Sequence, residues 1–264
     1  MSRATFRFFA ELNDFLPAER RQTSFPLEFH GRPAVKDAIE SLGVPHTEVD
    51  LILVDGRSVD FRHPLDDGDS VSVYPVFESF DISPVIRLRP TPLRRPAFIL
   101  DSHLGRLAAY LRLLGFDSAY RNDIGDEELA RTSADQRRIL LTRDRGLLKR
   151  SVVAHGYCVR SAKPRVQIRE VADRFDLAGS AAPFRRCLAC NGLLQPAEKS
   201  AVADRLPPGT RDRFDEFYRC AGCGKIYWPG AHFARLQNIV RDALGNHDSG
   251  NPCDPSGAES AASG

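Results

Sequence analysis

The sequence predicts an α/β protein of three parts, and three observations lead to this fold class. The first eighty residues mix strand and helix patterns, which is typical of a small α+β unit. From Ala97 onward, short apolar runs alternate with amphipathic segments, the pattern of strand–helix units in a parallel sheet. Two Cys-x-x-Cys pairs then indicate a small fold held by a metal ion. We expect domains at 1–80, 97–182 and 183–244, a linker at 81–96 and a disordered tail at 245–264.

The composition excludes several classes of protein. Of the 264 residues, 42% are hydrophobic and 27% are charged, which is too apolar for a disordered chain. No run of about eighteen apolar residues occurs, so we expect no membrane span. The first residues lack a continuous apolar stretch and a small-residue cleavage site, so we expect no secretion signal and a cytoplasmic protein. The net charge is only +2, but acidic residues gather in the first eighty positions and arginines from Arg87 onward. This asymmetry indicates a polyanionic partner for the body of the chain.

The first part has the element order of a β-grasp, or ubiquitin-like, fold. Strands are expected at 3–12, 25–31, 49–59 and 70–77. A helix is expected over 35–45, where apolar residues recur at helical spacing and Gly43 ends the pattern. Asp55-Gly56 divides the third segment and is a strong hairpin signal.

The segments LGVPHTEVDLILVDGRSV and LDDGDSVSVYPVF resemble the ThiS/MoaD-type sulfur carriers, over roughly residues 3–78. Those carriers work through a C-terminal glycine pair. Here the corresponding end reads Pro75-Val76-Phe77-Glu78-Ser79 and the chain continues. We therefore favour a docking or stabilising role over carrier chemistry, and a protein partner of this part stays open.

The linker over 81–96 holds four prolines and four arginines without a clear period. The second part then predicts a parallel, three-layer α/β/α domain. Its strands are expected at 97–100, 116–120, 138–142 and 157–160, and its helices at 103–115, 126–137, 145–156 and 166–177.

Carboxylates follow the strands of this predicted sheet. Asp101 comes directly after one strand, and Asp144 follows another by one residue. Asp126 and Glu127 begin the helix after the second strand, with Asp123 before them. Open parallel sheets place functional groups at the carboxyl ends of their strands. Converging carboxylates require a cation, and hard oxygen ligands select Mg²⁺ or Mn²⁺, which suits phosphodiester hydrolysis.

Each of these acids also has a purely structural interpretation. Asp126 and Glu127 fit the first turn of a solvated helix, where the helix dipole favours negative charge. Asp144 fits the cap of a helix that begins at Arg145, and Asp101 fits the cap of the helix expected from residue 103.

The resemblance becomes specific in the segments FILDSHLGRLAAYLRLLGFD, DEELARTSADQRRILLTRDRGLLKR, FRRCLACNGLL and FYRCAGCGKIYWPGAHFARL. Over about residues 97–240 they resemble the Mut-seven C-terminal RNase family, a branch of the PIN-like nucleases fused to a zinc ribbon. The resemblance implies a PIN-like fold and divalent-metal-dependent RNA cleavage. It implies acidic catalytic residues at Asp101, Asp126 and Asp144, with Asp123 and Glu127 as auxiliary candidates. Ser102-His103 stands where that pattern has a basic-apolar pair, which makes His103 a substrate contact or a solvent-facing residue.

Three arginines are candidates for substrate binding. Arg106 and Arg112 fall outside the apolar stripe of the first helix, and Arg143 precedes Asp144. A guanidinium beside the metal site binds a phosphate bidentately. The alternative is that these arginines pair with the acids and keep the fold neutral.

The cysteine pairs are the most specific signal in the sequence. Cys187, Cys190, Cys220 and Cys223 supply four thiolates to one tetrahedral Zn²⁺, and such a site is structural. A redox motif and an iron–sulfur cluster are the alternatives. A hairpin or a helix is expected around 196–205.

Arginines and aromatic residues are interleaved around the cysteines. Trp228 is the expected exposed stacking residue, and His232 is a second candidate contact. Basic groups with flat rings describe a platform for RNA that is single-stranded or structured, as in tRNA or rRNA. The alternative is that the rings form the ribbon's own core, as expected for Phe217 and Tyr227.

These observations predict a ribonuclease with a structural Zn²⁺ and a catalytic Mg²⁺ or Mn²⁺. A non-catalytic adaptor that binds RNA or the ribosome is the first alternative. A scaffold in sulfur-carrier metabolism is the second.

Overall fold

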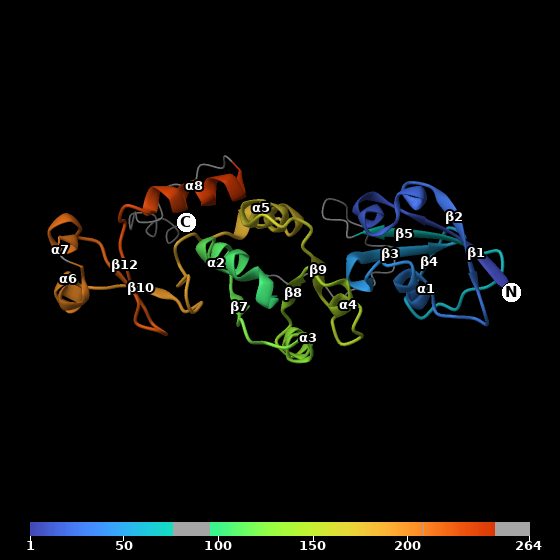
Figure 1. Cartoon of the computed structure of the whole chain (residues 1–264), viewed down its shortest axis with the longest axis horizontal. Coiled ribbons are helices and arrows are strands. Elements are labelled where there is room, and N and C mark those ends of the chain that lie inside the picture. The colour runs from blue at the N-terminus through green and yellow to red at the C-terminus, as the bar shows by residue number, and fades with distance from the viewer. Residues whose placement is uncertain (76–95, 208, 246–264) are drawn as a thin grey trace, which may run out of the picture. The chain divides into compact units, whose positions relative to one another are not determined.

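The computed structural model describes residues 1–75, 96–207 and 209–245 (Figure 1). The chain divides into two compact units, Met1–Leu104 with Tyr120–Arg160 and Gly105–Ala119 with Ser161–Gly264. The predicted linker and tail fall almost entirely outside the described residues, and the predicted domain boundaries stay predictions. Among the described helices, none is both long and apolar enough to cross a membrane.

The N-terminal sheet has the β-grasp order β2-β1-β5-β3-β4, with the central pair β1/β5 parallel. Its strands are β1 (Ser2–Phe8), β2 (Ser24–Phe29), β3 (Val49–Val54), β4 (Arg57–Val59) and β5 (Ser70–Pro75), and its helix is α1 (Val35–Ser41). Asp55 and Gly56 have φ of 48° and 78°, so the hairpin turn has the positive φ angles of type I′.

The first strand is shorter than predicted. It ends at Phe8 because Ala10 adopts a left-handed φ of 45°, and Ala10–Phe15 then forms a 3-10 helix. Leu12 and Phe15 of that helix are buried, so the aromatic and apolar pattern is real but belongs to two elements. Two further 3-10 turns lie at Ala18–Arg20 and His46–Glu48.

The second sheet has the order β7-β6-β8-β9, and β8 pairs in parallel with both β6 and β9. Its strands are β6 (Phe98–Leu100), β7 (Ser118–Tyr120), β8 (Ile139–Thr142) and β9 (Gly156–Cys158). β6, β8 and β9 are buried along their whole length, as expected of a parallel sheet. α3 spans Asp126–Asp135.

The helix predicted at 145–156 is too long. α4 ends at Leu148, and a turn joins it to β9. Val152 and Val153 are β-branched and disfavour helix, and the turn lets Val153 reach the core.

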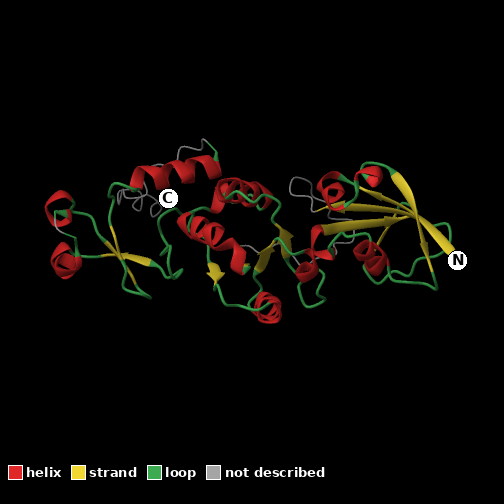
Figure 2. Ribbon diagram, viewed as in Figure 1, coloured by secondary structure: helices red, strands yellow, loops and turns green. Residues whose placement is uncertain are grey.

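Helices and a small sheet make up the rest (Figure 2). The 3-10 turn Ser102–Leu104 precedes α2 (Gly105–Leu113), and α5 (Pro164–Arg174) is followed by the 3-10 turn Ala178–Ser180. The small antiparallel sheet has β10 (Leu194–Pro196), β11 (Tyr218–Cys220) and β12 (Ile226–Tyr227). α6 (Lys199–Val202) continues into a 3-10 turn at Ala203–Arg205, and α7 is Thr210–Arg213.

The long helix α8 (Phe233–Leu244) was not predicted, because residues 183–244 were all assigned to the zinc ribbon. α8 contacts α5 and α2 through a stripe that includes the buried Ile239, Val240 and Ala243. The predicted fold class is confirmed: an α/β protein with a ubiquitin-like part, a parallel sheet and a C-terminal cysteine cluster.

Candidate functional site

Asp101 and Asp144 lie at the exits of neighbouring strands, and Thr142 joins them. The Asp101 N–H donates to the Leu141 carbonyl (3.1 Å). The buried Thr142 hydroxyl donates to Asp101 Oδ2 (2.7 Å) and accepts the Asp144 N–H (3.0 Å). Sequence reasoning missed Thr142; its signal was a hydroxyl residue that ends a buried strand just before an acid.

Hydrogen-bond donors surround the Asp101 carboxylate, whose side chain is 14% exposed. Its Oδ1 accepts from Ser102 Oγ (3.1 Å), the His103 N–H (3.1 Å) and His103 Nδ1 (2.9 Å). Burial acts to raise the pKa of Asp101, but the hydrogen bonds from Thr142, His103 and Ser102 lower that pKa below its ordinary value. Asp101 is therefore ionised at neutral pH. The His103 side chain is 85% exposed, so it faces solvent while it contacts Asp101.

Asp144 is the N-cap of α4, as its structural interpretation anticipated. Its Oδ1 accepts the Gly146 N–H (2.7 Å), and the residue is exposed. A carboxylate that caps a helix accepts the capping hydrogen bond through one of its two oxygens.

The three acids around the start of α3 are exposed. Asp123 pairs with Arg121 (3.2 Å), and the hydrogen bond from that guanidinium lowers the pKa of Asp123. Glu127 pairs with Arg131 one turn later (2.7 Å), and Asp126 lies in the first turn of the helix.

Metal-binding side chains cluster at the cysteines. Among the residues that the structure describes, Cys187, Cys190, Cys220 and Cys223 are the group of three or more whose ligand atoms lie within 4.8 Å of one another. Asp101, Asp126 and Asp144 do not form a second such group in the described part of the chain. The Thr142 hydroxyl thus links the Asp101 carboxylate to the main chain of Asp144, and Asp126 lies outside this contact.

The predicted substrate arginines differ in exposure. Arg106 and Arg143 are exposed, and Arg143 lies directly beside Asp144. Arg145, on the other side of Asp144, lies 4.8 Å from the centre of the Phe15 ring and donates to the Phe15 carbonyl (3.3 Å).

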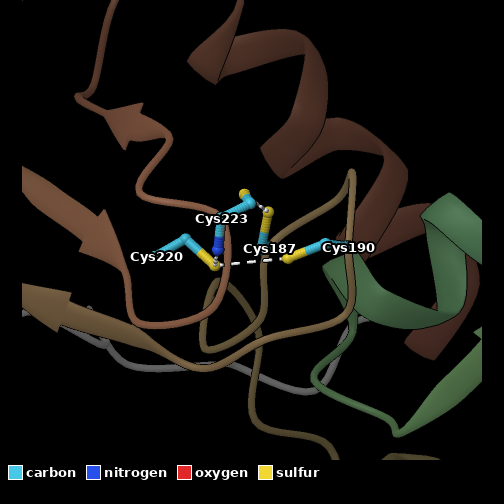
Figure 3. Close-up of side chains that lie close together, drawn as sticks. All are labelled: Cys187, Cys190, Cys220 and Cys223. Carbon is cyan, nitrogen blue, oxygen red and sulfur yellow. Dashed lines mark hydrogen bonds between the residues drawn. The ribbon is translucent and has the colours of Figure 1, made fainter.

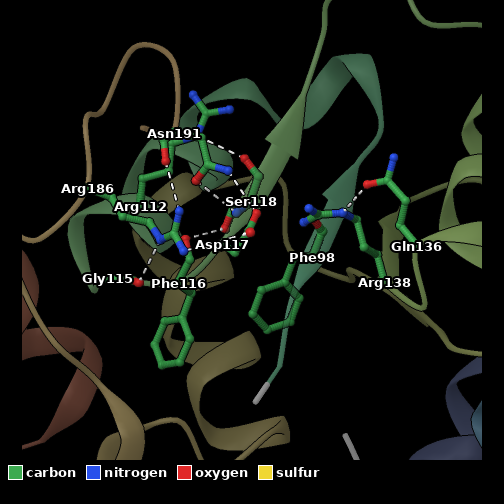
Figure 4. Close-up of polar contacts among 10 residues, drawn as sticks. All are labelled: Phe98, Arg112, Gly115, Phe116, Asp117, Ser118, Gln136, Arg138, Arg186 and Asn191. Carbon is green, nitrogen blue, oxygen red and sulfur yellow. Dashed lines mark hydrogen bonds and ion pairs between the residues drawn. The ribbon is translucent and has the colours of Figure 1, made fainter. Parts of the chain in front are cut away.

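Arg112 does not fit its predicted role as a substrate contact. Its guanidinium is buried and donates to the Ser118 carbonyl (2.9 Å; Figure 4). It also donates to the carbonyls of Leu188 (3.1 Å) and Ala189 (2.9 Å). Arg112 lies outside the leucine stripe, but α2 is also covered on this side by the loop of the first cysteine pair. Arg112 is therefore a structural residue.

The four thiols converge from two loops (Figure 3). Cys187 and Cys223 Sγ atoms are 3.6 Å apart, and those of Cys190 and Cys220 are 3.4 Å apart. The edge of a tetrahedron with Zn–S bonds of about 2.3 Å is about 3.8 Å, so this donor set fits one Zn²⁺. Burial acts to raise the pKa of Cys187, but hydrogen bonds from Tyr227 and the backbone bring it down to about 6.

The two cysteine loops have the same backbone hydrogen bonds. The N–H of Cys187 donates to Gly192 and that of Cys220 to Lys225, five residues on in each loop. The N–H of the residue four positions after each first cysteine, Asn191 or Gly224, donates back to that cysteine (3.0 Å in both). Both of these residues have a φ of 70°. Each loop is therefore a knuckle that needs a residue tolerant of the left-handed region.

The first knuckle is attached to the segment after α2 (Figure 4). Asn191 accepts the Ser118 N–H (3.1 Å) through Oδ1 and donates to Asp117 (2.8 Å) through Nδ2. Arg186 donates to the carbonyls of Asn191 (2.9 Å) and Gly115 (3.1 Å). The loop that supplies two thiols is thus fixed to its neighbours by side chains.

The aromatic residues around the cysteines are more buried in the ribbon than predicted. Phe217 is buried, and the Tyr227 hydroxyl lies 3.1 Å from Cys187 Sγ. Trp228 is half-buried rather than exposed, with its indole against Gly230, where an added Cβ would lie 2.8 Å from Nε1. His232 is exposed at the start of α8.

Comparisons with known proteins match two segments of the chain. A family model described as the Mut7-C RNAse domain matches residues 96–240, and one described as Mut7-C ubiquitin matches residues 1–81. The chain is 27% identical over 250 residues to the exonuclease mut-7 homolog of Homo sapiens. That alignment covers 65% of this chain and 28% of the human protein, so the chain spans less than a third of this relative's length.

Two solved structures also match. The small archaeal modifier protein 1 of H. volcanii is 18% identical with a TM-score of 0.24, and the match covers 28% of this chain and 98% of that one. A second structure, SAMP1 from Haloferax volcanii, is 17% identical with a TM-score of 0.24, and covers 30% of this chain and 100% of that one.

Proposed function

The chain belongs to the Mut7-C RNAse domain family, and from this premise we propose that it is a divalent-metal-dependent ribonuclease with a PIN-like catalytic domain. The observation that carries the proposal is the position of Asp101 and Asp144 at the exits of neighbouring strands, where the Thr142 hydroxyl bonds to the Asp101 carboxylate and to the main-chain N–H of Asp144. Ligands bind at this end of open parallel α/β sheets. The human relative that bears the name of an exonuclease supports the same class of reaction.

Carboxylate oxygens are the ligands that Mg²⁺ and Mn²⁺ prefer, and Asp101 is held in its ionised form by its hydrogen-bond donors. Asp101 and Asp144 would hold the ion, with Asp126 as a third ligand and Asp123 and Glu127 as auxiliary acids. The chemistry that such an ion supplies when bound is the activation of a water molecule and the stabilisation of the leaving oxygen.

The residues of the chain bind and orient the RNA. Thr142 and His103 orient the Asp101 carboxylate. Arg143 is exposed beside Asp144 and can bind a phosphate bidentately, and Arg106 is the second exposed candidate.

A structural Zn²⁺ held by the four cysteines would support an RNA-binding surface on the ribbon. His232 and the half-buried Trp228 are its candidate contacts. The substrate is RNA, either single-stranded or structured as in tRNA or rRNA, and the cytoplasm is the proposed location.

The test is cleavage of a labelled single-stranded RNA with Mg²⁺ or Mn²⁺ by the zinc-loaded full chain. Asp101→Asn and Asp144→Asn should each lower the cleavage rate by about 100-fold or more. Asp135→Asn, an exposed acid at the other end of α3, is the matched control and should leave the rate unchanged. Equal rates in all variants would remove the catalytic assignment. RNA binding with a steep salt dependence and no cleavage would favour the adaptor instead.

A further inference from the structure

The outer edge of the second sheet is occupied by residues of the β-grasp part, residues 1–75. β9 is an edge strand of that sheet, and the Cys158 N–H on it donates to Glu48 Oε1 (2.6 Å). Both partners belong to the same compact unit of the chain. An edge strand with open N–H groups is a template for unwanted pairing, which proteins prevent by covering the edge.

Glu48 is fully buried, and a buried carboxylate is tolerated only when it is paired. Arg160 supplies the opposite charge: its Nη2 lies 3.8 Å from Glu48 Oε2, and its Nε donates to Asp14 (3.1 Å). The Arg160 guanidinium also lies 5.4 Å from the centre of the Phe15 ring. The acidic residues of the first part thus meet basic residues of the second.

Two further contacts extend this interface to α4 and the turn after it. Lys149 Nζ donates to the Glu40 carbonyl (2.5 Å), and the Val153 carbonyl accepts from His46 Nε2 (3.1 Å). Arg145 packs on Phe15. Arg145 is the first residue of α4, the helix that Asp144 caps.

We infer that the β-grasp part acts within its own chain as a fixed cap on β9 and as the support of α4. Removal of this cap is costly, because the Cys158 N–H loses its Glu48 acceptor and the Arg160 guanidinium loses a nearby negative charge. The partner surface that this ubiquitin-like part fits is therefore the edge of its own parallel sheet. Only the support of α4 beside Asp144 rests on the proposed nuclease function.

The test is amide hydrogen exchange at Cys158 in the zinc-loaded full chain. Glu48→Ala should speed exchange of this amide by about tenfold or more, while Leu140, whose N–H lies inside the sheet, changes much less. Glu28→Ala, an exposed acid on β2, is the matched control and should leave both amides unchanged. Exchange at Cys158 that stays within twofold of wild type in Glu48→Ala would overturn the inference, and so would equal acceleration at Leu140.

If Glu48→Ala does not fold, Glu48→Gln keeps an acceptor for Cys158 and removes only the charge that faces Arg160. Faster exchange at Cys158 is expected there too, by a smaller factor, and unchanged exchange would contradict the cap. RNA cleavage is measured separately in the same samples. A wild-type chain that does not cleave RNA would refute the proposed function and leave the exchange result intact.

Discussion

The cysteine centre and the strand-exit acids are the two metal sites that we propose, and they are built in different ways. The four thiols come from two local loops with the same hydrogen bonds, and they lie within 4.8 Å of one another. Asp101 and Asp144 depend on the pairing of β6 with β8, and a single hydroxyl joins them. Each half of the first centre is therefore formed by short-range structure, and the second site depends on the order of strands in a sheet.

Loss of a thiol should have the largest effect. Cys187→Ser removes one of four ligands, and structural zinc contributes about 10–16 kcal/mol of apparent binding free energy to small zinc folds. We expect zinc content to fall from one ion per chain toward zero and the thermal transition of the ribbon to be lost. Elemental analysis and calorimetry measure both quantities. Cys158→Ala, a buried cysteine outside the cluster, should keep the ion, and full zinc retention in Cys187→Ser would refute the assignment.

Arg112→Met should destabilise the protein next most strongly. The change buries an uncharged side chain in place of the guanidinium and leaves the carbonyls of the buried Ser118 and of Leu188 and Ala189 without their charged donor, at a cost of about 3 kcal/mol in the free energy of unfolding. Arg106→Met, an exposed arginine near the start of the same helix, should stay within about 0.5 kcal/mol of wild type. Chemical denaturation compares the two variants. A neutral Arg112→Met would mean that the knuckle does not depend on this contact.

Thr142→Val should weaken the hydrogen bonding at the strand exits and leave the cysteine centre unchanged. The Asp101 carboxylate loses one donor and the Asp144 N–H loses its acceptor, at about 1–3 kcal/mol. Asp101 has a lowered pKa, so it stabilises the fold above the ordinary aspartate pKa, and that contribution is lost as pH falls through the folded value. Without the Thr142 donor the pKa of Asp101 is less lowered, so this contribution is smaller and stability should fall less between pH 6 and pH 3. Denaturation from pH 6 down to pH 3 tests the direction, and a curve parallel to wild type would contradict it.

Asn191→Gly should have the smallest effect. Glycine keeps the φ of 70° but loses the contacts with Asp117 and Ser118, which we expect to cost about 1 kcal/mol. Asn191→Ala should cost about 1 kcal/mol more, because alanine is strained in the left-handed region. Zinc content should be unchanged in both, and a loss of zinc in Asn191→Gly would show that the side chain itself forms the knuckle.

The same contrast explains what the sequence predicted. The Asp55-Gly56 hairpin and the cysteine pairs were predicted because residues a few positions apart determine them. The burial of Arg112 had no local signal, since its acceptors at Leu188 and Ala189 lie more than seventy positions away. The burial of Glu48 had no local signal either, since its partner Cys158 is 110 positions distant.

The predicted acidic residues show how far a functional site can be predicted from the sequence. Strand exits placed Asp101 and Asp144 on one edge correctly, because parallel strands share their carboxyl ends. The position of Asp126 depends on how α3 is oriented, which helix periodicity does not determine. That Asp126 serves as a third ligand therefore stays a prediction.

Titration with Mn²⁺, followed by electron paramagnetic resonance, tests the central claim most directly. The zinc-loaded wild type should bind Mn²⁺ at its strand exits, and both Asp101→Asn and Asp144→Asn should lose this binding while they keep one zinc ion per chain. Mn²⁺ binding that is the same in wild type and in both variants would show that these carboxylates do not hold a metal.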